Sequence, residues 1–251
     1  MQDRWGEAGF ARGWDQRNAA RDNPDRGEQL DILAALLADA WRAGDWLLDL
    51  GSGSGQVEEM IFERVPSARA VGVDSSPPMM ALARERLARF PGRFEGVEGA
   101  MEDLGRLAVP HAPFAFVLSS QALHEIPHPA KREAFAQAFR LLRPGGSFFI
   151  LDRIEPAFAK LPASYQSVWD RLNRRAALAE PMSYAEYVAK YGGKKDHPAR
   201  LEELIAWLEA AGFAAAPLYL HFNRVLIAAR RGGVNSGGKT ELSRPRPGRK
   251  V

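Results

Sequence analysis

The sequence predicts an α/β protein built on a doubly wound, mostly parallel sheet. A short apolar run, Trp46 to Leu50, has the composition of a strand buried on both faces. Gly51, Gly53 and Gly55 follow it at alternate positions, and a helical pattern starts at Gln56. Apolar runs and helical patterns then alternate along the chain, as expected when crossover helices join parallel strands.

The predicted elements follow in chain order. Trp5, Phe10 and Trp14 are apolar anchors in a polar N-terminal segment, which either folds over a ligand or packs on the body of the fold. Arg143-Pro144-Gly145-Gly146 is expected to stop a helix and return the chain to the sheet. Helices are predicted over 29–41, 56–64, 77–90, 130–142 and 201–211, and strands over 46–50, 70–73, 93–97, 114–119, 147–152, 215–221 and 224–229.

Composition limits the class of protein. A chain of 251 residues with 46% hydrophobic content is expected to form one domain, residues 1–231. It has no cysteine, which excludes disulfides, thiolate metal sites and a cysteine nucleophile. The N-terminus lacks a secretory signal pattern, and the most apolar helical stretch, Leu30 to Trp41, contains Asp39. We therefore expect a soluble, cytoplasmic protein with no membrane association.

The basic charge is concentrated at the C-terminus. Residues 232–251 hold five basic side chains and one acidic one, so this segment carries +4, and the rest of the chain carries −1 of the net charge of +3. Its Gly, Pro, Ser and Arg content predicts a disordered tail. The tail is either simply solvated or a contact for nucleic acid or an anionic membrane.

The spacing of the glycine loop selects among ligands. A dinucleotide fingerprint needs Gly-x-Gly-x-x-Gly, but Gln56 or Glu58 stands at its last position, and no Gly-Lys-Ser/Thr triplet follows. The pattern Asp49-x-Gly51-x-Gly53-x-Gly55 resembles the first motif of class I S-adenosylmethionine-dependent methyltransferases. The resemblance extends over about residues 30–150 and 199–230. It implies a Rossmann-like seven-stranded sheet with a C-terminal antiparallel hairpin, and S-adenosylmethionine as cofactor.

Asp74 is the predicted ribose ligand. It ends the second strand, about 20 residues past the glycine loop, where an acidic side chain can accept hydrogen bonds from ribose hydroxyls. The alternative, a cap for the next helix, is already supplied by Ser75 or Ser76 before Pro77. The predicted cofactor-binding residues are Asp49, Gly51, Ser52, Gly53, Gly55, Asp74, Ser75, Met79, Met101, Glu102 and Ser119.

The adenine contacts depart from the family pattern. An acidic residue commonly follows the glycine at this point in the family, whereas this chain has Ala100 after Gly99. The backbone amide of Met101 is then expected to meet the adenine ring. Glu102 or Asp103 either receives the amino group or is a solvated loop residue.

His124 is the candidate general base. It follows the fourth strand within Ser119 to Ile126, a segment that resembles the family's fourth motif, where the acceptor is bound. Imidazole titrates near neutrality and can remove a proton from an acceptor. The alternative is a packing or hydrogen-bonding role.

The stretch from Arg153 to Arg200 is longer than a connection requires and predicts a helical cover over the sheet edge. Its aromatic residues recur at helical spacing, which fits either acceptor recognition or packing, and its basic residues either bind an acidic acceptor or are solvated. The predicted substrate-binding residues are Trp14, His124, Tyr165, Trp169 and Tyr184.

The leading hypothesis is a methyltransferase that moves a methyl group from the sulfonium to an O, N or C acceptor of a small molecule by in-line displacement. We expect no metal and a monomer or homodimer. The cover and the final hairpin are also loosely similar to carboxy-S-adenosylmethionine synthases. The sequence leaves two more functions open, a non-catalytic S-adenosylmethionine-binding protein and a nucleic-acid methyltransferase steered by the tail.

Overall fold

The computed structural model describes residues 4–15, 23–156, 158, 160–191 and 196–233. Its centre is a seven-stranded sheet in the order β3-β2-β1-β4-β5-β7-β6. β7 runs antiparallel to both neighbours, and the other pairs are parallel. The predicted sheet with its C-terminal antiparallel hairpin is therefore confirmed. The strands are β1 (Leu47–Leu50), β2 (Ala70–Asp74), β3 (Phe94–Glu98), β4 (Phe114–Ser120), β5 (Leu142–Arg153), β6 (Phe213–His221) and β7 (Arg224–Arg231).

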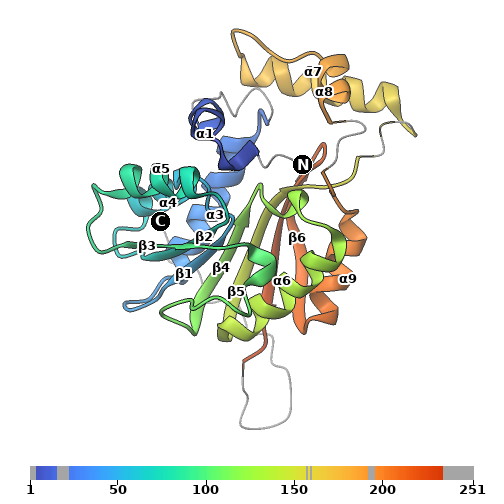
Figure 1. The fold of residues 1–251 in the computed structure, drawn as a ribbon. Helices are drawn as coiled ribbons and strands as arrows, with labels where there is room; N and C mark the ends of the chain where they lie inside the picture. Colours follow the sequence, from blue (N-terminus) through green and yellow to red (C-terminus); the bar gives the residue numbers. More distant parts are fainter. Residues whose placement is uncertain (1–3, 16–22, 157, 159, 192–195, 234–251) are drawn as a thin grey trace, which may run out of the picture.

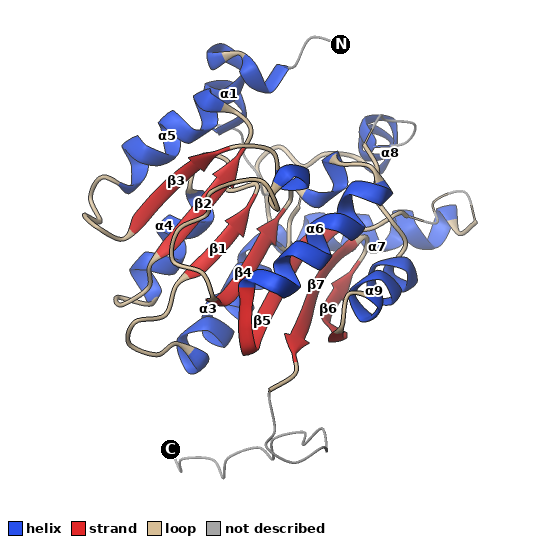
Figure 2. Ribbon diagram, turned by 60° about the horizontal axis from the view of Figure 1, so that its bottom comes forward, coloured by secondary structure: helices blue, strands red, loops and turns tan. Residues whose placement is uncertain are grey.

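Helices cover both faces of the sheet (Figure 2). α3 and α4 pack on one face, where Leu33, Leu37 and Phe62 join a buried apolar cluster. α6 and α9 pack on the other face through a second cluster that includes Phe135 and Leu208. The helices are α1 (Ala8–Asp15), α3 (Arg26–Ala40), α4 (Gln56–Arg64), α5 (Pro77–Leu87), α6 (His128–Leu141), α7 (Pro162–Ala176), α8 (Tyr184–Tyr191) and α9 (Leu201–Ala210), with short 3-10 turns η1 (Arg4–Gly6), η2 (Met101–Asp103) and η3 (Leu123–Glu125).

The predicted helix stop after α6 is confirmed, but the return to the sheet differs from expectation. Strand β5 begins immediately at Leu142 and includes the turn residues, with a register shift against β4 between Phe114 and Phe116. Gly145 has a φ of 78°, and a Cβ on Gly146 would lie 2.9 Å from the Ala115 carbonyl oxygen. The glycines therefore let an irregular strand start pass close to its neighbour.

Two segments lie beyond the sheet at its carboxyl edge. α1 lies beside α5, and the helical cover, α7 and α8, lies farther out (Figure 1). Among the residues that the structure describes, every helix is too short or too polar to cross a bilayer. Most of the predicted tail, residues 234–251, lies outside the described residues.

Candidate functional site

The glycine loop turns sharply at the end of β1. The backbone amides of Gly51 and Ser52 donate to the carbonyl oxygen of Val73, at 2.8 and 3.2 Å, which ties the loop to β2. A Cβ on Gly51 would lie 2.3 Å from the Ala122 Cβ, so the loop after β4 can approach only because this position is glycine. Gly53 has a φ of 56° and open space where its Cβ would be. Gly53 therefore leaves room for a ligand to reach the backbone.

Asp74 joins the two strand ends that form the site. Its Oδ2 accepts a hydrogen bond from the Gly53 amide and its Oδ1 accepts one from the Ser76 amide, both at 2.8 Å. Burial raises the pKa of Asp74, and these two donors partly offset that rise. A carboxylate has about four lone-pair positions, so two remain for ribose hydroxyls. The predicted helix cap is separate, because Ser76 Oγ accepts from the Met79 amide at 3.2 Å.

Two buried carboxyl groups face each other behind the loop. Asp49 on β1 is 1% exposed and Glu58 on α4 is fully buried. Burial, followed by the neighbouring Glu58, raises the pKa of Asp49 well above its ordinary value. Burial raises the pKa of Glu58 from 4.5 to about 7. Asp49 Oδ1 and both Glu58 oxygens have no hydrogen-bond donor among the described residues, so a proton held by the pair would bridge one oxygen of each group.

The N-terminal helix is latched onto the glycine loop. The guanidinium of Arg86 donates to both Asp15 carboxylate oxygens at 3.0 Å, and Gln56 Nε2 donates to Asp15 Oδ1 at 2.8 Å. Ser54 Oγ also donates to Asp15. Burial alone would raise the pKa of Asp15, but these donors hold it below its ordinary value. The latch places Trp5 and Trp14, whose rings meet edge to face at 5.7 Å, in the wall of a pocket.

This pocket lies where the strand ends, the glycine loop and α1 meet. It brings together most of the predicted cofactor residues, and it also contains residues outside the predicted cofactor-binding and substrate-binding sets, among them Trp5, which the sequence marked only as an apolar anchor. The predicted residues in its wall are Gly51, Ser52, Gly53, Asp74, Ser75, Met79, Met101, Glu102 and Trp14. The additional ones are Trp5, Arg26, Ser54, Gln56, Val57, Val73, Ser120, Gln121, Ala122, Glu125 and Ile126.

Three predicted cofactor residues support the pocket from outside its wall. Ser119 is buried, and its Oγ donates to the Leu50 carbonyl oxygen at 2.8 Å, while Ser120 lines the pocket instead. A Cβ on Gly55 would lie 3.2 Å from Ala83, so this glycine serves the packing of α4 against α5. Asp49 is the third, behind the loop. Of the two acids offered for adenine, Glu102 lines the pocket and Asp103 pairs with Arg106 at the surface.

His124 forms a buried dyad with the last acid of β5. Its Nδ1 lies 2.5 Å from Asp152 Oδ1, and its backbone amide donates to Asp152 Oδ2 at 2.9 Å. Burial alone would lower the pKa of His124, but Asp152 and Glu125 together hold it above its ordinary value. The imidazole does not line the pocket; its Nε2 lies 3.4 Å from Glu125, which does. His124 therefore reaches the pocket through Glu125.

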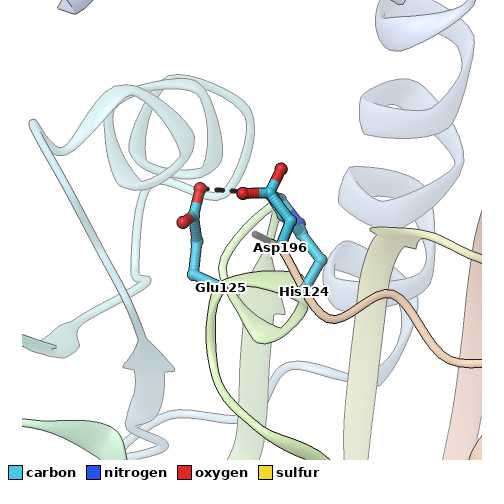
Figure 3. Close-up of side chains that lie close together, drawn as sticks. All are labelled: His124, Glu125 and Asp196. Atoms are coloured by element: carbon cyan, nitrogen blue, oxygen red, sulfur yellow. Dashed lines mark ion pairs between the residues drawn. The ribbon is translucent and has the colours of Figure 1, made fainter. Parts of the chain in front are cut away.

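Asp196 lies next to His124 and Glu125 (Figure 3). One possible ligand atom from each of these three side chains lies within 4.8 Å of the others. Asp196 forms an ion pair with Arg153. The Nδ1 of His124 is engaged by Asp152. The neighbouring guanidinium neutralises part of the negative charge that a cation would need. The absence of a metal stays a prediction.

The aromatic residues of the cover pack on one another. Trp169 is 1% exposed, and its ring lies 4.2 Å from that of Tyr187 and 5.2 Å from that of Phe222. Tyr165 and Tyr184 contact the same group through Phe158. No described residue of 153–200 lines the pocket. Packing thus accounts for the positions of these rings, and their role in substrate binding stays a prediction.

Comparison with known proteins finds methyltransferases. A family model described as a methyltransferase domain matches residues 47–146. A trans-aconitate 2-methyltransferase of Methylobacterium nodulans is 31% identical over 166 residues, which are 66% of this chain and 56% of that protein. A demethylmenaquinone methyltransferase of Thermus thermophilus is 29% identical over 72% of this chain and 80% of its own length. The chain thus spans little more than half of the Methylobacterium relative.

Solved structures share the fold at low identity. An O-methyltransferase family protein from Burkholderia thailandensis has a TM-score of 0.66 at 20% identity, over 93% of this chain and 63% of that chain. Magnesium protoporphyrin IX methyltransferase from Synechocystis, solved with bound SAH, has a TM-score of 0.64 at 14% identity, over 92% of this chain and 98% of that chain. The match identifies residues 47–146 as a methyltransferase domain, and the sheet that holds its glycine loop has the fold that these solved structures share.

Proposed function

We propose that this chain is an enzyme that transfers a methyl group from S-adenosylmethionine to an O, N or C atom of a small molecule. The observation that carries the proposal is the pocket at the carboxyl edge, where the glycine loop, Asp74 and the loop after β4 converge under the N-terminal aromatic residues. Open parallel sheets bind their ligands at this edge, next to the point where the strand order reverses. Here that point lies between β1 and β4.

The pocket offers contacts for both the ribose and the adenine of the cofactor. Gly53 offers backbone without a Cβ, and Asp74 offers lone pairs for ribose hydroxyls. Met79 and Met101 give apolar surface for a base, with Glu102 beside them as an acceptor for an amino group. When bound, S-adenosylmethionine supplies a methyl group activated by its sulfonium. The aromatic rings of Trp5 and Trp14 exclude water from the pocket, which favours direct displacement.

The chain also offers a route for a proton. Asp152 holds the His124 ring by Nδ1, which leaves Nε2 directed to Glu125 in the pocket wall. In this proposal Glu125 receives a proton from the acceptor and shares it with His124. An acceptor that needs no deprotonation would use the same pocket without this pair.

The competing functions differ in support. A carboxy-S-adenosylmethionine synthase would be favoured by an arginine of the cover in the pocket, and the described part of the cover supplies none. A non-catalytic binding protein is favoured by Ala100 and by the indirect position of His124. Nucleic-acid methylation is supported only by the basic charge of residues 232–251. Of these, residues 234–251 lie outside the described residues.

The test is methyl transfer from S-adenosylmethionine labelled on its methyl carbon. The acceptor panel begins with trans-aconitate and a demethylmenaquinone, the compounds in the names of two relatives. We expect labelled product that is lost in Asp74→Ala and kept in Asp103→Ala, a surface control. Cofactor binding with no transfer to any acceptor in a broad panel would contradict the enzyme proposal and favour a non-catalytic binding protein.

A further inference from the structure

Arg26 is the only cationic side chain in the pocket wall formed by the described residues. It stands at the first position of α3 and is partly buried. Other arginines near the site are paired: Arg86 with Asp15, Arg153 with Asp196 and Arg175 with Asp25. Within the described part of the chain, no ion pair or side-chain hydrogen bond engages the Arg26 guanidinium. A half-buried guanidinium without a counter-ion is costly unless an anion completes the site.

A second arginine increases this cost. Arg224, the first residue of β7, is 5% exposed and lies close enough to repel Arg26. Burial, followed by this repulsion, lowers the pKa of Arg26. Arg224 Nη1 donates to Gln121 Oε1 at 3.1 Å, and Gln121 lines the same pocket. Arg224 therefore adds a second positive charge near Arg26 and holds the Gln121 amide, although Arg224 itself does not line the pocket.

The acids of the pocket wall do not compensate the charge. Asp74 accepts from the Gly53 and Ser76 amides, and Glu125 lies against His124. Glu102 lies in η2, which follows β3 in the chain, and it forms no ion pair with Arg26 in the described structure. The charge on Arg26 is thus available to a ligand rather than to the protein.

We propose that Arg26, with Arg224 and Gln121 behind it, is a carboxylate-binding site in the wall of the pocket. A guanidinium binds a carboxylate through two parallel hydrogen bonds, and Arg26, the one cation that the described residues place in the pocket wall, matches a singly charged carboxylate better than a phosphate. The inference rests on the proposed function, which supplies two sources of carboxylate. One is the methionine end of S-adenosylmethionine, and the other is an acidic acceptor.

Four ligands separate these sources by calorimetry on the full chain. S-adenosylhomocysteine carries the amino-acid carboxylate, and 5′-methylthioadenosine lacks it. Trans-aconitate, titrated with and without S-adenosylhomocysteine, carries acceptor carboxylates, and its trimethyl ester lacks them. The proteins are the unmodified chain, Arg26→Gln, Arg26→Lys and the exposed control Arg140→Gln, each checked for an unchanged thermal midpoint.

We expect Arg26→Gln to weaken at least one carboxylate ligand tenfold or more, with Arg26→Lys intermediate and Arg140→Gln unchanged. Weaker S-adenosylhomocysteine binding with unchanged 5′-methylthioadenosine binding assigns the site to the cofactor. Unchanged binding of both nucleosides with weaker trans-aconitate binding assigns it to the acceptor. Affinities within twofold for every ligand would overturn the site. A folded, unmodified chain that binds neither nucleoside would instead overturn the proposed function, and the trans-aconitate titration without nucleoside would still test Arg26.

Discussion

Replacing Glu58 by glutamine tests the buried carboxyl pair behind the glycine loop. Glu58 is fully buried against Asp49, and burial raises its pKa from 4.5 to about 7. Below pH 4.5 the side chain is protonated in both the folded and the unfolded chain. Between these two values only the folded chain keeps the proton, so the free energy of unfolding falls as the pH rises. Above pH 7 the fall ends.

The size of this fall follows from the pKa. At about 1.36 kcal/mol per pH unit, a rise from 4.5 to about 7 corresponds to about 3 kcal/mol. Glutamine cannot ionise, and its amide can donate to the Asp49 carboxylate. The free energy of unfolding of Glu58→Gln, relative to the unmodified chain, should therefore increase by up to about 3 kcal/mol between pH 4.5 and pH 8.

The assay is urea unfolding followed by circular dichroism at half-unit pH steps and constant ionic strength. Glu63→Gln, on the same helix but exposed and paired with Arg89, is the control and should shift the curve by less than about 1 kcal/mol at every pH. Parallel stability curves for Glu58→Gln and the unmodified chain across this range would show that folding does not raise the pKa of Glu58.

Three further predictions concern the loop, the latch and the dyad. Gly51→Ala should lower the free energy of unfolding by about 1 to 3 kcal/mol more than Gly44→Ala, because both positions have positive φ but only Gly51 meets Ala122; equal losses by urea unfolding would contradict this. Asp15→Ala should weaken S-adenosylhomocysteine binding, because α1 loses its contacts to Arg86, Ser54 and Gln56. The rate at which trypsin cleaves the chain N-terminal to Arg26 should also rise, and an unchanged cleavage rate would disprove the latch. Asp152→Asn should move the ascending limb of the pH–rate profile to lower pH, because Asp152 raises the pKa of His124 and the base must be neutral; an unmoved limb would exclude His124 as the proton carrier.

The sequence predicted the sheet well because its strands carry local signals. Leu47–Leu50 is apolar throughout except for Asp49, since both faces of β1 are covered, and the glycines after it mark a turn that few other residues can form. Asp74 followed from its position at a strand end. These features depend on neighbours in sequence, so periodicity and spacing reveal them.

The remaining parts of the site depend on contacts between distant segments. Nothing near Arg26 in sequence indicates a pocket, because Gly51 and Gln121 come from the loops after β1 and β4, and Arg224 is the first residue of β7. Similarly, the pair formed by Asp49 and Glu58 is visible only when α4 lies over β1. Trp169 and Tyr184 showed helical spacing, but spacing alone does not say whether the face meets a ligand or other aromatic rings.

Calorimetric titration of S-adenosylhomocysteine into the intact chain and into Asp74→Ala decides whether this pocket holds the cofactor. We predict one site per chain and a loss of at least about 1 kcal/mol in Asp74→Ala, the net value of a typical hydrogen bond, with Asp103→Ala unchanged. A folded chain that does not bind S-adenosylhomocysteine, or that binds it equally well without the Asp74 carboxylate, would contradict the assignment of this pocket to the cofactor.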